Sequence, residues 1–206
     1  MIKDFFKALM SDEVETVPFE TQLQTLAASG ILPNADVSEV TIISELKKLG
    51  FDKKDTENDP SLLLTVFGSS REIGEGIFEP NSRDVLHLDT QCVQESGIYT
   101  EVLSSLIDMA KGSLELTDID EVLDLENFEA QIAFVHNGNP YKWSLRVAED
   151  NFDITLLTKL NNLLTDEKSE KNFYMQCDEE TVIIIFTDID TANSLNKTLD
   201  LGFELA

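Results

Sequence analysis

His87 and Asp89 are the two residues whose types and spacing come closest to a catalytic or metal-binding pair. They stand two positions apart in a predicted strand, so both side chains project from the same face of the sheet. An imidazole beside a carboxylate could act as an acid/base dyad or provide half of a metal site. A metal site needs three or four ligands, and the one other imidazole is His136, in a predicted hairpin turn. We therefore expect His87 and Asp89 to form a hydrogen-bonded structural pair.

Three further patterns could suggest a binding site for a metal ion or a phosphate, but each is better explained by a structural role or by chance. Asp118–Glu126 is similar to a calcium-binding loop, but it lacks the glycine at the sixth position and the regular spacing of acids. Thr187–Asp190 is expected to cap a helix, because carboxylates are stabilised at helix N-termini. Gly74–Gly76 lacks the third glycine of a phosphate-binding loop. The sequence thus predicts no catalytic residue, no metal ligand and no cofactor.

The cysteines and the apolar runs favour the cytoplasm as the location of the protein. Cys92 and Cys177 are 85 positions apart and form neither a CxxC motif nor a metal-binding spacing. Free buried thiols in a reducing cytoplasm are expected rather than a disulfide. The densest apolar run, Val182–Phe186, is far shorter than the roughly 20 residues of a membrane-spanning helix. The first residues lack a secretory cleavage site, so we expect a cytoplasmic protein.

The pattern of glycines and apolar residues divides the chain into three parts. Residues 1–68 have apolar residues at helical spacing, with stops at Gly30 and Gly50, and are expected to form a helical N-terminal subdomain. Residues 69–83 contain glycines and scattered charges and are interpreted as a connector. Residues 84–206 alternate between strand and helix patterns and predict an α+β domain. The whole chain could also form one compact domain, with the connector as a long loop.

Within residues 84–206, the period of the apolar residues predicts which segments are strands and which are helices. Phe128–His136 alternates between apolar and polar residues, and Asn137–Pro140 after it is a typical hairpin turn. The strands are expected at 84–90, 128–136, 141–147, 172–177 and 181–187, and the helices at 97–111, 153–164 and 188–199. An acidic connection is expected at 113–127. The predicted fold is a mainly antiparallel sheet with helices packed on one face, after the helical N-terminal part.

The charge of the chain favours some classes of partner over others. The 206 residues include 40 acidic and 15 basic ones, which gives a formal charge of −25. Apolar residues make up 42%, so the chain is expected to fold rather than to form a disordered acidic tail. Nucleic acid and anionic membranes are bound through Lys and Arg, so both are disfavoured as direct partners. A basic protein is favoured, because opposite charges speed association.

The acids are most concentrated in residues 112–129, which contain seven acidic residues and no basic one. Glu149–Asp153 is a second acidic segment, and the two would form one acidic face if they pack together. We expect this face to bind a basic partner. The candidate partner-binding residues are Asp118, Asp120, Glu121, Asp124, Glu126, Glu149, Asp150 and Asp153.

Six short patterns are spread along most of the chain: Phe19–Ile31, Leu86–Tyr99, Gly112–Glu121, Tyr141–Trp143, Glu149–Asp153 and Thr198–Phe203. In their order they resemble a family of uncharacterised bacterial cytoplasmic proteins. The family pattern has a tryptophan between Asp150 and Asp153, where this chain has Asn151 and Phe152. The resemblance implies a small partner protein, of the kind that gives immunity to a bacterial toxin.

We therefore expect a non-enzymatic protein-binding module, an immunity-type inhibitor that covers the basic surface of a bacterial toxin domain. One alternative is a nucleic-acid mimic that blocks a DNA-binding protein, with acids spaced like phosphates along an elongated face. Another is an enzyme of unrecognised class that uses His87 and Asp89 in a concave pocket. A structural or assembly subunit is neither favoured nor opposed by the residues, and the oligomeric state is open.

Overall fold

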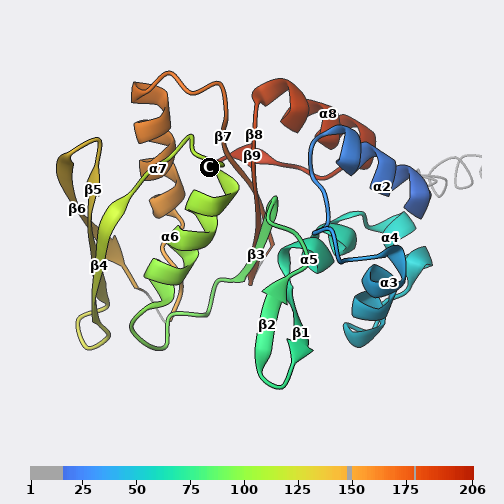
Figure 1. The fold of residues 1–206 in the computed structure, drawn as a ribbon, viewed down its shortest axis with the longest axis horizontal. Helices are drawn as coiled ribbons and strands as arrows, with labels where there is room; N and C mark the ends of the chain where they lie inside the picture. Colours follow the sequence, from blue (N-terminus) through green and yellow to red (C-terminus); the bar gives the residue numbers. More distant parts are fainter. Residues whose placement is uncertain (1–15, 148–149, 179) are drawn as a thin grey trace, which may run out of the picture.

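The computed structural model describes residues 16–147, 150–178 and 180–206. Within these ranges the chain forms seven α-helices and nine β-strands, and the strands pair into three antiparallel sheets. The expected α+β class is therefore confirmed. Figure 1 shows a three-stranded sheet at one end of the molecule, the N-terminal helices at the other end, and a four-stranded sheet between them.

The N-terminal part contains four short helices, α2 (Phe19–Ala28), α3 (Glu39–Lys48), α4 (Lys53–Asn58) and α5 (Ser61–Gly68). The Ser38 hydroxyl accepts a hydrogen bond from the Thr41 N–H group and begins α3. Asp52 begins α4 in the same way, through the N–H groups of Lys54 and Asp55. The sequence did not predict α4, because its six residues contain no apolar repeat.

The predicted connector at 69–83 contains a β-hairpin, formed by β1 (Ser70–Gly74) and β2 (Ile77–Pro80). Gly76 in its turn has a φ angle of 73°, which glycine adopts without a steric penalty. The Arg71 guanidinium forms an ion pair with Asp36 and so ties the hairpin to the segment before α3. The rest of the hairpin projects from the lower side of the molecule in Figure 1.

The central sheet consists of β3 (Val85–Asp89), β8 (Thr181–Thr187), β7 (Asn172–Cys177) and β9 (Glu204–Leu205), in that order. Successive residues of β8 point to opposite faces of the sheet, so they enter two different cores. Val182 and Ile184 belong to one core, and Ile183 and Ile185 belong to the other. Burial on both faces explains why β8 has a continuous apolar run instead of an alternating pattern.

The outer sheet consists of β4 (Thr117–Asp124), β5 (Glu129–His136) and β6 (Asn139–Arg146). The helices α6 (Ile98–Met109) and α7 (Thr155–Asp166) cover one of its faces (Figure 1). The expectation of an acidic connection at 113–127 is wrong for β4. This segment is an edge strand, with Ile119 and Leu123 packed against the core and with Asp118, Asp120 and Asp124 on the outer side.

The two cores lie on opposite sides of the central sheet. One lies between this sheet, α6, α7 and the outer sheet, and includes Leu103, Phe134 and Leu160. The other lies between the central sheet and the helices α2, α3, α5 and α8 (Ile189–Leu199), and includes Phe19 and Phe67. The outer sheet has helices on one face, as expected, whereas the central sheet is covered on both. No helix in the described ranges is both long enough and apolar enough to cross a bilayer.

Candidate protein-binding surface

His87 and Asp89 are not joined in the way that the sequence predicts. His87 lies on the same face of β3 as Val85, and its side chain is half-buried. Burial lowers the pKa of the imidazole, and the Asp89 charge opposes this effect only in part. The Asp89 carboxylate instead accepts a hydrogen bond from the Gln91 N–H group at 2.8 Å. No hydrogen bond between His87 and Asp89 is found in the described chain, so the expected pair does not form.

The second imidazole, His136, holds the end of the outer sheet to the chain around it. Its side chain is buried, with Nδ1 at 2.8 Å from the Glu115 carbonyl oxygen and Nε2 at 3.0 Å from Glu167 Oε1. Both ring nitrogens thus have partners within the fold. Among the residues that the structure describes, no three His, Cys, Asp or Glu side chains are grouped so that they could hold a metal ion.

Both cysteines are free thiols. Cys92 is half-buried and Cys177 is exposed, so the expectation that both are buried is wrong for Cys177. Desolvation raises the pKa of both thiols. A raised pKa leaves little thiolate at neutral pH, which makes either side chain a poor nucleophile.

Glu121 is one of the candidate partner-binding residues, but its carboxylate serves the N-terminus of α6. It points inward from β4 and accepts hydrogen bonds from the N–H groups of Gly97 and Thr100, each at 3.1 Å. A carboxylate in this position satisfies free amide groups of the first helical turn and interacts favourably with the helix dipole. Glu121 therefore helps to hold α6 in position against the outer sheet.

Asp153 has a similar role at the start of α7. Its Oδ1 accepts a hydrogen bond from the Thr155 N–H group at 3.0 Å, and its Oδ2 accepts one from the Arg146 N–H group at 2.9 Å. The Asp153 N–H group donates to the hydroxyl of Tyr99, which is fully buried. These three hydrogen bonds join the end of β6, the start of α7 and the buried Tyr99 in the first turn of α6.

The other acids of the first segment face solvent. Asp118, Asp120 and Asp124 lie on the outer side of β4, and Glu126 lies in the turn to β5. Asp124 accepts hydrogen bonds from the side chain and the N–H group of Asn127, and these lower its pKa. On the same open face, the ladder pairs place Lys142 and Arg146 on β6, two strands from β4. The backbones of β4 and β6 are therefore about 9–10 Å apart. Among the residues that the structure describes, neither base forms an ion pair with an acid of β4.

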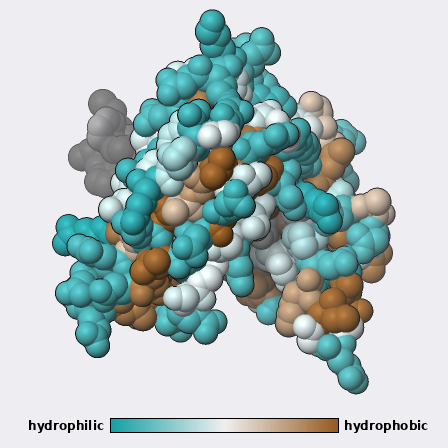
Figure 2. All heavy atoms as spheres, turned by 60° about the vertical axis from the view of Figure 1, so that its left-hand side comes forward, coloured by the Kyte–Doolittle hydropathy of each residue, from teal (hydrophilic) through white to brown (hydrophobic). Residues whose placement is uncertain are grey.

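Exposed apolar side chains alternate with these acids. Val122 lies between Asp120 and Asp124 and is 57% exposed, and Phe128, directly before β5, is 55% exposed. Leu125, in the turn, is 39% exposed. In Figure 2 the outer sheet comes forward, and brown apolar atoms lie among teal hydrophilic ones at its lower end. We call this surface the acidic edge; it comprises Asp118, Asp120, Val122, Asp124, Leu125, Glu126 and Phe128.

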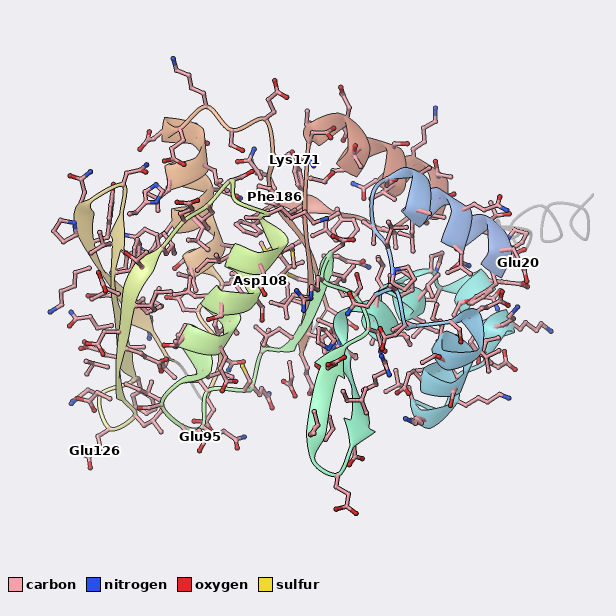
Figure 3. All side chains as sticks on the ribbon, viewed as in Figure 1. Glu20, Glu95, Asp108, Glu126, Lys171 and Phe186 are labelled. Carbon is pink, nitrogen blue, oxygen red and sulfur yellow. The ribbon has the colours of Figure 1, made fainter. Side chains whose placement is uncertain are left out.

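The second acidic segment meets the acidic edge. The Val147 N–H group donates to the Phe128 carbonyl at 2.8 Å, and Asp153 lines the same surface cavity as Phe128. Asp150, three residues before Asp153, is exposed to solvent. Glu149 lies outside the described residues. Figure 3 shows Glu126 and Glu95 at this same end of the molecule, opposite Glu20.

The sequence pointed to the acids of this surface but missed its apolar members. The alternation in Phe128–His136 suggested that Phe128 is buried, and this is wrong. Its φ angle of 57° turns the chain just before β5, and the ring is exposed. Val122, Leu123 and Leu125 stand among the acids of residues 120–126, so the sequence indicated apolar side chains in this run but did not indicate which of them are exposed.

Comparisons of the chain with family models, with curated proteins and with solved structures found no match.

Proposed function

We propose that this chain is a non-enzymatic binding protein for a basic protein, and specifically an immunity-type inhibitor of a basic bacterial toxin domain. The observation that carries the proposal is the acidic edge, where exposed carboxylates alternate with exposed apolar side chains. Carboxylates speed association with a basic surface, whereas apolar side chains stabilise the complex through burial. Because the surface offers both, it supports a folded protein as the partner.

The nucleic-acid mimic is less well supported by the same surface. Such a mimic needs an uninterrupted row of charges, and Asp118, Asp120 and Asp124 form part of one along β4. Val122 occupies the position between Asp120 and Asp124, on the outer side of the strand. An apolar side chain at that position contributes to binding a protein surface, but it does not imitate a phosphate.

The charge part of the proposal is tested by a triple variant, Asp118→Asn with Asp120→Asn and Asp124→Asn. Calorimetry at low salt would measure its binding to the basic toxin domain encoded beside the gene for this chain. We expect Kd to rise about tenfold, because three exposed charge contacts are lost.

The matched control removes three exposed acids from other parts of the surface, through Asp166→Asn, Glu170→Gln and Asp200→Asn. The control has the same net charge as the edge variant but leaves the acidic edge unchanged. It should therefore retain most of the affinity. The proposal is contradicted if the unmodified chain does not bind the toxin domain. It is equally contradicted if both triple variants bind with the same affinity.

The apolar part is tested by Phe128→Asn, since asparagine tolerates the left-handed backbone at this position. For a protein partner we expect affinity to fall, whereas Val40→Ser, at another exposed apolar position on α3, should change nothing. A nucleic-acid mimic would lose affinity in the charge variant and keep it in Phe128→Asn.

A further inference from the structure

The hairpin of β1 and β2, which projects from the lower side of the molecule in Figure 1, carries a second group of exposed apolar side chains. Phe78 is 64% exposed, and Ile73 and Ile77 are also exposed. Directly opposite residues of an antiparallel pair lie on the same face. Phe78 is opposite Glu72, and Pro80, two residues further on, is opposite Ser70. Phe78 and Pro80 therefore share one face of the hairpin.

That face is turned toward a groove between the hairpin and α6. The groove has a volume of about 280 Å³, and Ser70 and Pro80 form its wall on the hairpin side. Val85 and Met109, both almost fully buried, contribute apolar atoms to its floor, and Asp108 stands on the α6 side. Phe78 extends the same wall outward into solvent. We call this surface the hairpin groove.

The charges around the hairpin groove are predominantly negative. Glu72 lies on the same face as Phe78, and Asp108 is exposed on α6. Glu75 in the turn adds a further carboxylate, whereas Glu79 lies on the opposite face of the hairpin, across from Arg71. The hairpin's own Arg71 is largely buried in its ion pair with Asp36, so Arg83 is the base that lines the groove. An apolar side chain flanked by Lys or Arg is complementary to this arrangement.

The hairpin groove and the acidic edge face the same side of the molecule. Figure 2 shows two projections at the lower side, the end of the outer sheet and the hairpin, with a hollow between them. Figure 1 shows both projections pointing downward, with α6 between them. A protein bound to the acidic edge would therefore meet the hairpin groove across the outer side of α6.

We propose that the hairpin groove is a second contact area for the same basic protein, and that it accepts an apolar side chain flanked by cationic ones. This inference rests on the proposed function, because it assigns a second surface to the same partner. Exposed aromatic side chains that become buried at an interface contribute much of its binding free energy. Phe78 is therefore expected to be the main anchor.

The test compares Phe78→Ser and Asp108→Asn with the controls Ile189→Ser and Asp200→Asn, which lie on or after α8 and away from the groove. Binding to the basic toxin domain encoded beside the gene is measured by calorimetry and stopped flow. We expect Phe78→Ser to weaken binding about tenfold or more. Asp108→Asn should slow association, and both controls should bind as the unmodified chain does. Amide exchange at 70–80 should also slow in the complex.

Each outcome decides between the proposals. If the chain binds the domain and Phe78→Ser binds equally well, the second contact area is overturned and the proposed function stands. If the unmodified chain binds no such domain, both are overturned. If the free chain is a dimer that Phe78→Ser converts to a monomer, the occupant of the groove is a second copy of this chain, and the inference is overturned.

Discussion

Asp188 shows how a single carboxylate determines where a helix begins. Its Oδ1 accepts a hydrogen bond from the Thr191 N–H group at 2.8 Å, and its Oδ2 lies 2.9 Å from the Thr191 hydroxyl. These hydrogen bonds, the one from the backbone above all, hold the pKa of Asp188 below its ordinary value. The ionised form of the side chain is therefore the one that stabilises α8.

We predict that Asp188→Ala lowers the free energy of unfolding by about 1 kcal/mol at pH 7, as expected for a lost N-cap. A pKa that is lower in the folded state gives a stabilisation that is complete above the unfolded pKa and is lost as the pH falls through the folded pKa. The difference between parent and variant should thus shrink below about pH 4. Urea unfolding at pH 7 and in acid measures this, with Asp188→Asn as the control that keeps a capping oxygen. An equal difference at both pH values would contradict the prediction.

Caps of this kind are predictable from sequence only when both partners are close in the chain. Ser38 and Asp188 each cap through a residue three positions away, and the sequence indicates both. Glu121 caps α6 from 21 residues further along the chain, which requires β4 to be in place first. The sequence therefore identifies Glu121 as acidic but gives no indication that its carboxylate is turned inward.

At the scale of elements, the end of α5 approaches β3 unusually closely. A Cβ atom on Gly68 would lie 2.4 Å from the backbone nitrogen of His87 and 2.8 Å from its Cβ. Both atoms belong to β3, which lies at the edge of the central sheet and pairs with β8, so neither moves without disturbing that pairing. A residue without a side chain is thus required where the helical part meets the sheet.

We predict that Gly68→Ala lowers the free energy of unfolding by about 1–3 kcal/mol, the usual cost of overpacking a buried contact. Gly74→Ala is the matched control, because the nearest atom to a new Cβ there is a flexible side-chain carbon at 3.8 Å. Denaturant unfolding of both variants provides the comparison. Equal stabilities of the two variants would show that α5 can shift away from β3 at no cost.

The elements that the sequence failed to predict share a physical reason. The strands and helices with one fully buried side, such as β5 and α6, have clear apolar periods and were predicted within a few residues. The hairpin of β1 and β2 and the edge strand β4 bury few side chains, so their apolar residues show no clear period. The surfaces that we propose for binding are built from these same elements.

At the scale of the whole molecule, the acids greatly outnumber their possible partners. With 40 acidic and 15 basic residues, one-to-one pairing would leave 25 acids without a base. Some bases serve two acids, as Lys53 does for Glu20 and Glu39. The remaining like charges repel one another and oppose the compact state.

We predict that added salt raises the melting temperature by several degrees between low ionic strength and about 0.3 M, because screening weakens this repulsion. Calorimetry in sodium chloride measures the effect. The variant with Asp166→Asn, Glu170→Gln and Asp200→Asn should melt higher at low salt and gain less from added salt. A melting temperature that is independent of salt would mean that repulsion contributes little to stability.

Because the side chains of β8 belong to both cores, the chain is difficult to divide into separately expressed pieces. A piece that begins at residue 84 would keep the whole central sheet and α8, but Val85, Ile183 and Ile185 would lose their cover from α2, α3 and α5. A partly uncovered apolar sheet face of this kind promotes association between copies. Although the acidic edge lies at the opposite end of the molecule, any shortened version made for binding work therefore has to retain α2 to α5.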